Sequence, residues 1–175
     1  MTDVRDDGYP GTAELEPPSP TEAIGELESA LNSLVRLLKQ TRLHGFILDR
    51  AQADVDRAGM ALLYVLYVQG ASPRLTELAE HLHIDAPAVS RKVQQLERAG
   101  LVGRARDEGD GRATRLWLTE SGRATIDRIL AARRDWLAAV TADWPAGEQA
   151  EFARLLRRFA GDVHRHLEDI DVCEP

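Results

Sequence analysis

Apolar residues recur at intervals of three and four over residues 75–82, which is the spacing of one face of an α-helix. A three-residue interval separates this segment from a second helical pattern at 86–99. Asp85 can cap the second helix, Pro87 falls in its first turn, and Gly100 supplies its end. The sequence therefore predicts two helices joined by a short turn. The residues expected to pack between them are Leu78, Ala79 and Leu82 of the first helix and Val89, Val93 and Leu96 of the second.

The other side of the second helix carries small and polar residues. Bulky side chains there would hold the backbone away from the bases, so this pattern is typical of a helix that enters the major groove of DNA. Arg91 and Gln94 are long enough to reach base edges, where arginine pairs with guanine and glutamine with adenine. Ser90 suits a phosphate or a short polar contact. The residues of this helix predicted to face DNA are Ala86, Pro87, Ala88, Ser90, Arg91 and Gln94.

A stretch rich in Gly and Asp, residues 107–112, lies between two short runs with partial alternation of apolar and polar positions. This pattern predicts a β-hairpin that forms a wing beside the second helix. Arg112 at the tip is placed to enter a minor groove, whose negative potential attracts arginine. Phosphates repel Asp110, so we expect it to brace the tip through an arginine such as Arg104 or Arg106. Both of these arginines are also predicted to contact DNA.

Amphipathic helices are predicted before this central unit. A first long helix, capped by Ser19 or Thr21, has a narrow apolar seam and a less regular continuation that Gly45 can bend. The next helix begins at Asp54 or Asp56. It is apolar nearly all round, so we expect it to be buried.

Two more helices are predicted after the wing, the first of them capped by Thr119. Helices from both ends of the chain carry apolar seams larger than a small winged domain can cover. We therefore expect a mainly α fold with a small β-hairpin wing, in which these helices intertwine with those of a second copy in a homodimer. The predicted parts are a disordered acidic and proline-rich tail at 1–20, an N-terminal dimerisation helix and connection at 21–55, a winged helix-turn-helix domain at 56–118, and C-terminal dimerisation helices at 119–175.

The net charge of −7 and the pI near 5.3 argue at first against binding to nucleic acid. The distribution of charge reverses that inference, because residues 90–106 hold five basic side chains against Glu97 alone. Local potential over a binding face, rather than the summed charge, governs contact with phosphate. Double-stranded DNA is therefore a compatible partner.

Cysteine content and hydropathy indicate where the protein works. Cys173 is the only cysteine, which excludes an intrachain disulfide and a cysteine metal cluster and favours a reducing cytoplasm. The first residues lack the pattern of a signal peptide. The longest apolar run, 60–68, is far shorter than the roughly 20 residues that a membrane-spanning helix needs. We therefore expect a cytoplasmic protein with no membrane association.

Several segments of the central third resemble the signature of the MarR family of winged-helix regulators. They are Val89-Ser90-Arg91, residues 96–102, Arg104, Asp110-Gly111-Arg112 and residues 118–123. The resemblance implies a homodimer that binds a palindromic operator and usually represses transcription until a small ligand or an oxidant releases it. It also implies roles for Ser90, Arg91 and Gln94 in the recognition helix and for Asp110 and Arg112 in the wing. The base-reading positions vary within the family, so the operator sequence is not implied.

A small aromatic effector is expected in a cleft between the winged domain and the dimerisation helices. The candidate lining residues are His44, Phe46, Tyr64, Tyr67 and Trp136, each of which is equally compatible with an ordinary packed core. No cofactor is expected. The spacing of the histidines does not indicate a metal site, and the acidic residues before Cys173 disfavour a thiolate switch there.

Three other classes of function compete with a regulator. An enzyme is disfavoured because the chain has no nucleophile elbow, phosphate loop or zinc-protease motif. A winged-helix module that binds other proteins would suit the acidic total charge. A nonspecific architectural DNA binder would bind all sequences equally.

Overall fold

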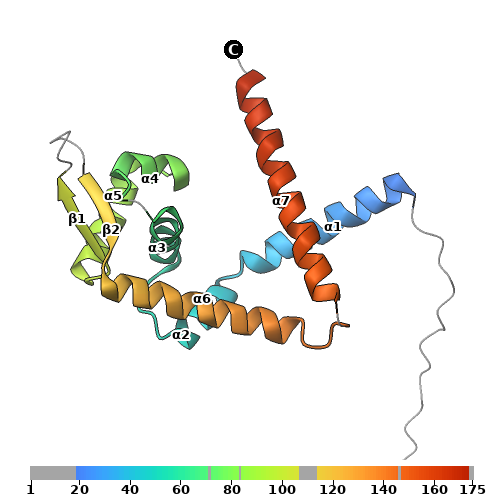
Figure 1. Cartoon of the computed structure of the whole chain (residues 1–175), viewed down its shortest axis with the longest axis horizontal. Helices are drawn as coiled ribbons and strands as arrows, with labels where there is room; N and C mark the ends of the chain where they lie inside the picture. Colours follow the sequence, from blue (N-terminus) through green and yellow to red (C-terminus); the bar gives the residue numbers. More distant parts are fainter. Residues whose placement is uncertain (1–18, 71, 83, 107–113, 146, 174–175) are drawn as a thin grey trace, which may run out of the picture. The chain divides into compact units, whose positions relative to one another are not determined.

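The computed structural model describes residues 19–70, 72–82, 84–106, 114–145 and 147–173, with side-chain environments given as far as Ile170 (Figure 1). The predicted tail at 1–20 lies almost wholly outside this part. The chain divides into two compact units, Met1–Leu43 and His44–Pro175, and each is described by itself.

The first unit contains helix α1 (Pro20–Leu38) and the start of α2 (Thr41–Arg50). Ser19 caps α1 in a capping box: the backbone N–H of Glu22 donates to Ser19 Oγ at 3.4 Å, and Ser19 N–H donates to Glu22 Oε2 at 2.9 Å. Ser19, one of the two predicted caps, is therefore confirmed.

Gly45, which was expected to permit a bend in the first helix, lies inside α2. The helical pattern is interrupted earlier, at the end of α1. There Gln40 N–H donates to Leu37 O at 3.1 Å and closes a tighter i to i+3 turn. The interruption between the two helices therefore lies between Leu38 and Thr41 and involves no glycine.

The second unit continues through α3 (Arg57–Gln69), α4 (Leu75–Leu82), α5 (Ala86–Arg98), β1 (Val102–Arg106), β2 (Thr114–Leu118), α6 (Glu120–Val140) and α7 (Glu148–Cys173). Asp56, Asp85 and Thr119 cap α3, α5 and α6. Gly70 and Gly100 follow the ends of α3 and α5 with φ of 60° and 72°, the left-handed conformation that glycine adopts most readily. The predicted helix-turn-helix and the helices on either side of it are thus confirmed, with ends shifted by a few residues at most.

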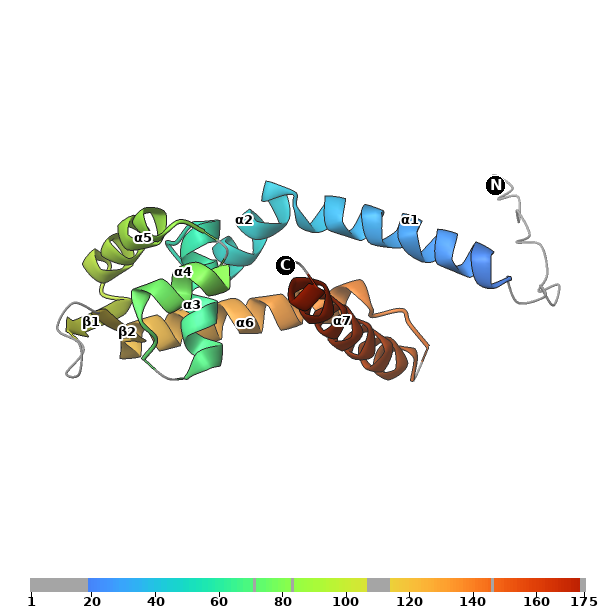
Figure 2. The same ribbon diagram turned by 90° about the horizontal axis from the view of Figure 1, so that it is seen from above.

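β1 and β2 form an antiparallel hairpin in a register that runs from Val102 opposite Leu118 to Arg106 opposite Thr114. The middle of β2 is hydrogen-bonded to the segment before α4, because Leu116 N–H donates to Pro73 O at 3.0 Å. In Figures 1 and 2 the hairpin, α3, α4 and α5 lie together beside the N-terminal part of α6.

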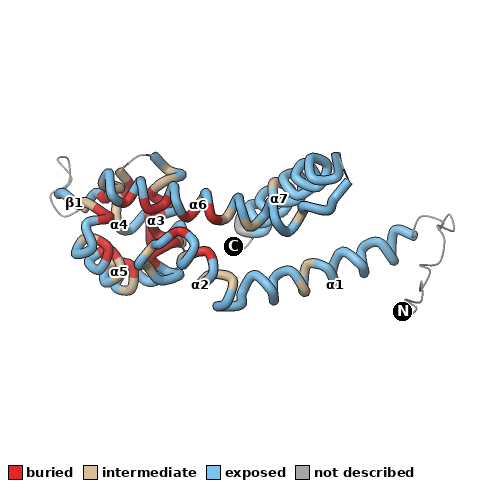
Figure 3. Tube along the Cα trace, turned by 90° about the horizontal axis from the view of Figure 1, so that it is seen from below, coloured by how far each residue is buried: buried red, intermediate tan, exposed pale blue. Residues whose placement is uncertain are grey.

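The hydrophobic core lies among α3, α4, α5, the hairpin and the first half of α6, where Figure 3 shows the buried positions. Val68 departs from the prediction that α3 is buried nearly all round, since it is 62% exposed. Tyr64, one turn earlier on the same side, is also exposed, so the neighbouring elements cover only part of the α3 surface. The side chains buried most completely are Leu62, Leu63, Leu78, Val93, Val102, Leu116, Ile126 and Ile129.

Apolar side chains on α7 are exposed, in contrast to those of the core. Between Phe152 and Ile170 the large apolar residues of this helix have exposures of 37–55%. Leu137 and Val140 at the end of α6 are exposed as well. In the described part of the chain, no helix combines the length and the apolar composition needed to cross a membrane.

Candidate nucleic-acid interface

Helix α5 turns one face into the core and another to solvent. Val89, Val93 and Leu96 are buried, while Arg91 and Gln94 are exposed. This is the orientation that a recognition helix requires, because the side chains that read bases must point away from the fold. The structure thus places the two predicted base-reading residues on the outer face.

The N-terminal half of α5 is slender. Ala86, Ala88 and Ser90 are half-buried and Pro87 is exposed. Asp85 Oδ1 accepts the backbone N–H of Ala88 at 2.8 Å, so the first turn is closed by its cap. Small side chains in a capped first turn allow the backbone to approach a duplex closely.

Arg98 completes the exposed stripe of α5, since it lies seven residues after Arg91 and therefore on the same side of the helix. Among the described residues, neither arginine is paired with a carboxylate. Arg98 was not among the residues predicted to face DNA. Its helical spacing from Arg91 was the signal that would have placed it on the outer face.

The wing is attached to α5 by an ion pair. Arg104 Nε donates to Glu97 Oε1 at 2.9 Å, which joins β1 to the last turn of the recognition helix. Arg106 is exposed on the same strand. Asp110, the predicted brace, and Arg112, the predicted minor-groove contact, both lie outside the described residues.

A tryptophan crosses the outer face of the hairpin. Gly103 of β1 is opposite Trp117 of β2, and a Cβ on Gly103 would lie only 2.4 Å from the indole Cε2. The ring therefore rests on the glycine backbone, and Trp117 is 40% exposed.

Lys92 is oriented differently from Arg91. Its Nζ lies 2.5 Å from Asp56 Oδ2 and 2.8 Å from Gln95 Oε1. Asp56 precedes α3, so this ion pair connects the recognition helix to the start of another helix. Sequence spacing gave no sign of it, because the two residues are 36 positions apart.

The end of α5 is joined closely to α6. Thr119 Oγ1 donates to Gly100 O at 2.6 Å, and Thr119 N–H donates to Leu101 O at 3.1 Å. Gly122 N–H donates back to Thr119 Oγ1 at 3.0 Å. The turn after the recognition helix is therefore held to the first turn of α6 by consecutive hydrogen bonds.

The candidate effector residues occupy several environments. His44, Tyr67 and Trp136 are half-buried, whereas Phe46 and Tyr64 are exposed. Two α6 arginines lie over the tyrosine rings of α3, with Arg123 Cζ 5.3 Å from the Tyr67 centroid and Arg133 Cζ 5.9 Å from that of Tyr64.

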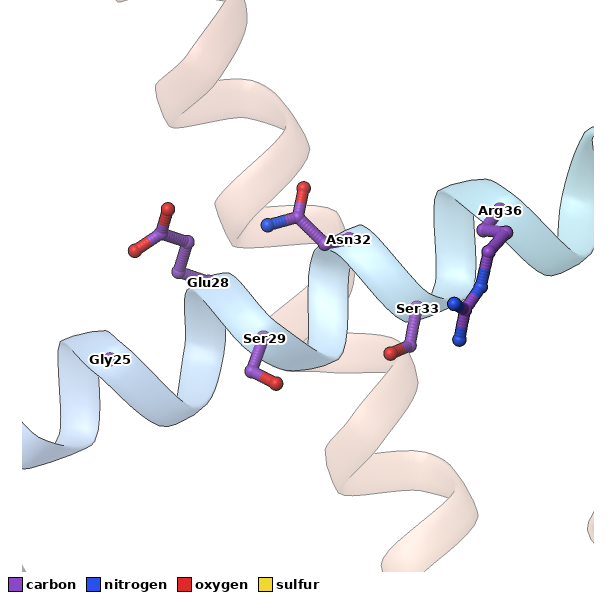
Figure 4. Close-up of a pocket in the computed structure, with 6 residues that line it drawn as sticks. All are labelled: Gly25, Glu28, Ser29, Asn32, Ser33 and Arg36. Carbon is purple, nitrogen blue, oxygen red and sulfur yellow. The ribbon is translucent and has the colours of Figure 1, made fainter.

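The pocket in Figure 4 is a different feature. It is an open depression along one polar side of α1, and the residues that line it are Gly25, Glu28, Ser29, Asn32, Ser33 and Arg36. None of these is a predicted effector residue. Because a single helix supplies all of its walls, the depression does not enclose a ligand.

Metal-ligating side chains do not gather in the described part of the chain. His164 Nε2 instead lies 3.2 Å from Glu168 on the same face of α7. The surroundings of His83 and of the Cys173 side chain lie outside the described residues.

A helix-turn-helix whose second helix exposes arginine and glutamine, with an antiparallel hairpin attached beside it, defines a winged-helix DNA-binding protein. Residues 57–114 match the model of the MarR family. The chain is 37% identical over 125 residues to the HTH-type transcriptional repressor Rv2887 of Mycobacterium tuberculosis, covering 69% of this chain and 90% of that protein. The chain therefore belongs to the MarR family and is a DNA-binding transcriptional regulator.

Solved structures agree with this assignment. A MarR family protein from Bacillus stearothermophilus superposes with a TM-score of 0.71 at 26% identity, covering 84% of this chain and 99% of that one. The F27L mutant of S. aureus MepR, solved bound to an oligodeoxyribonucleotide, has a TM-score of 0.55 at 20% identity, covering 76% and 97% of the two chains. At that identity, MepR supports the fold alone.

Proposed function

We propose that this regulator is a homodimeric repressor that binds a palindromic operator in the cytoplasm and releases it when a small aromatic molecule binds. The observation that carries the DNA-reading part is the outer face of α5, where Arg91, Gln94 and Arg98 are exposed beside the wing. The repressor assignment is supported by the mycobacterial relative, which is itself named a repressor.

The proposed roles differ along α5. Arg91 and Gln94 lie within reach of base edges when the N-terminal half of the helix is in the major groove. Arg98 is one turn further from that end, so its guanidinium contacts phosphate. Arg106 on the wing, together with Arg112 of the predicted wing tip, is proposed to extend the contact to the neighbouring groove.

The exposed apolar side chains of α7 support a dimer. Monomeric soluble proteins rarely expose contiguous apolar patches of more than a few hundred Å². The seam of α1 is likewise open: Ile24, Leu27, Leu34 and Leu38 are 39–66% exposed. A homodimer that binds a palindrome is expected to present its two recognition helices about 34 Å apart, one turn of B-DNA.

Selection of bound duplexes from random DNA tests the DNA-reading proposal. A palindromic consensus is expected. Arg91→Ala should then weaken operator binding by about 1–3 kcal/mol and relax the sequence preference at one base position. Arg98→Ala should weaken binding to all DNA sequences by the same factor. Unchanged binding by Arg91→Ala would contradict the assigned face. Equal affinity for every sequence would favour an architectural DNA binder. Affinity for duplex DNA that is absent, or that does not change with salt concentration, would favour a protein-interaction module.

Light scattering at micromolar concentration tests the assembly. The wild-type chain is expected to have the mass of a dimer, and Phe159→Glu on the apolar side of α7 should yield a smaller species. Arg157→Glu, a charged substitution at a polar position of the same helix, is the matched control. A wild-type monomer that binds the operator equally well would refute the dimer.

The proposed effector site is formed by the predicted residues around Tyr64 and Tyr67. The guanidinium groups of Arg133 and Arg123 over these rings suit an aromatic carboxylate, which presents an anion and an apolar ring together. Benzoate is the simplest probe. Benzoate should lower the operator affinity of the wild type and have less effect on that of Tyr67→Ala. If the wild type binds the operator equally well with and without benzoate, aromatic carboxylates are not the effector class.

A further inference from the structure

Lys92, unlike Arg91 and Arg98 of the same helix, is hydrogen-bonded to other side chains of the described part of the chain. Its side chain is 20% exposed, and its Nζ hydrogen bonds to both Asp56 Oδ2 and Gln95 Oε1. Release of Lys92 toward a phosphate would break both contacts and leave the Asp56 carboxylate without its cation. The Lys92 ammonium group therefore forms an ion pair with another residue of the protein.

Asp56 uses its two oxygens for two different elements. Oδ1 accepts the backbone N–H of Gly59 at 2.8 Å and so caps α3, while Oδ2 holds Lys92 of α5. The largest single effect on the Asp56 pKa is burial, which raises it, but the hydrogen bonds from Lys92 and Gly59 together with the Lys92 charge outweigh burial and lower the pKa. The carboxylate is therefore charged at neutral pH and attracts Lys92, although its own side chain is 56% exposed.

The two helices also lie close together at this point. A Cβ on Gly59 would lie 3.3 Å from Leu96 Cδ2, so the first turn of α3 packs tightly on α5. Apolar contacts such as this one fix the distance between helices, but they are less directional than a hydrogen-bonded ion pair.

The position of Lys92 on the helix relates the ion pair to the outer face. With 3.6 residues per turn, Arg91 is about 100° and Gln94 about 160° away from Lys92 around the α5 axis. A contact that holds Lys92 on α3 thereby sets the direction in which both of these side chains point.

We propose that Lys92 is a positioning residue of the DNA-reading surface: anchored by Asp56 and Gln95, it fixes the rotation of α5 about its own axis and makes no contact with phosphate. This inference rests on the proposed operator binding. It concerns how the reading face is oriented rather than which residues read.

The test compares Lys92→Met, Asp56→Asn and the double variant on the operator selected by the wild type and on a scrambled duplex of the same length. Methionine keeps most of the apolar stem of Lys92, and asparagine is as good a helix cap as aspartate. Each single variant should lose about three- to tenfold in operator affinity and less on scrambled DNA, and the double variant should lose no more than either one. Lys92→Arg, which keeps the charge, should recover part of the loss.

Salt dependence separates positioning from phosphate binding. Lys92→Met should keep the wild-type slope of log affinity against log salt concentration. The control Arg98→Met should reduce that slope by about 1 and weaken both DNAs equally. A reduced slope for Lys92→Met, additive losses in the double variant, or an unchanged ratio of operator to scrambled affinity would each overturn the proposal.

Two further outcomes are distinguishable. If the wild type enriches no sequence at all, the proposed operator binding fails and Lys92 has no reading surface to position. If Lys92→Met does not fold, as judged by circular dichroism, Asp56→Asn and Lys92→Gln give the same comparison with smaller changes in shape.

Discussion

Gly122 provides a sharp test of how tightly the recognition helix is joined to α6. It is the third residue of α6 and is buried. A Cβ placed on it would lie 1.9 Å from the carbonyl oxygen of Leu101 and 2.9 Å from the carbonyl carbon. Gly122→Ala therefore pushes one backbone segment directly against another.

The magnitude follows from this geometry. To regain an ordinary contact of 3.4 Å, the Leu101 carbonyl has to move by roughly 1.5 Å. Leu101 O also accepts the N–H of Thr119 at 3.1 Å, so the movement strains that hydrogen bond. Overpacking of this kind costs on the order of 1–3 kcal/mol, which lowers the melting temperature by about 3–10 °C in a domain of this size.

Urea and thermal unfolding, followed by circular dichroism, measure the effect. Gly45→Ala is the matched control, because that glycine is also helical and a Cβ on it meets nothing within 4 Å. The control should be neutral or stabilise by up to about 1 kcal/mol, the helix propensity of alanine over glycine. If Gly122→Ala unfolds at the wild-type midpoint or above it, the inferred close approach is wrong.

Three further substitutions or conditions are predictable. Asp85→Ala removes the cap of α5, which accepts from Ala88 N–H, and should cost about 1 kcal/mol in urea unfolding, whereas Asp85→Asn should cost much less; equal losses would contradict a capping role. Gly103→Ala should destabilise less than Gly122→Ala, because it meets the Trp117 side chain, which is partly exposed and can rotate away. The lowered pKa of Asp56 means that its contribution to stability is present above the ordinary aspartate pKa of about 3.9 and is lost as pH falls through the lower folded value. Asp56→Asn should therefore reduce the acid sensitivity of the unfolding midpoint, and an identical pH profile would argue against the ion pair.

Local sequence chemistry was sufficient to predict much of the fold. Asp85, Pro87 and Gly100 set the ends of α5 through interactions within a few residues, and the spacing of Val89, Val93 and Leu96 set its buried face. Because the buried positions determine which side of the helix is left to solvent, the exposure of Arg91 and Gln94 was predictable as well.

Contacts between distant segments were not predictable in the same way. Arg104 or Arg106 was expected to brace the wing through Asp110, which lies outside the described residues, whereas the ion pair of Arg104 with Glu97 on α5 was not predicted. Lys92 was counted among the cations available to DNA and is instead paired with Asp56. The sequence shows which residues are charged, but it does not show which carboxylate pairs with which cation. That pairing depends on which elements pack together in the fold.

The indole of Trp117 gives this protein an intrinsic optical probe at its wing. Trp117 belongs to β2, and its ring lies on the backbone of Gly103 in β1. With Trp136 and Trp144 replaced by phenylalanine, its emission would come from the hairpin alone, and docking of a duplex beside it would change the intensity or wavelength without any attached dye. Binding at the wing could then be followed in real time by fluorescence.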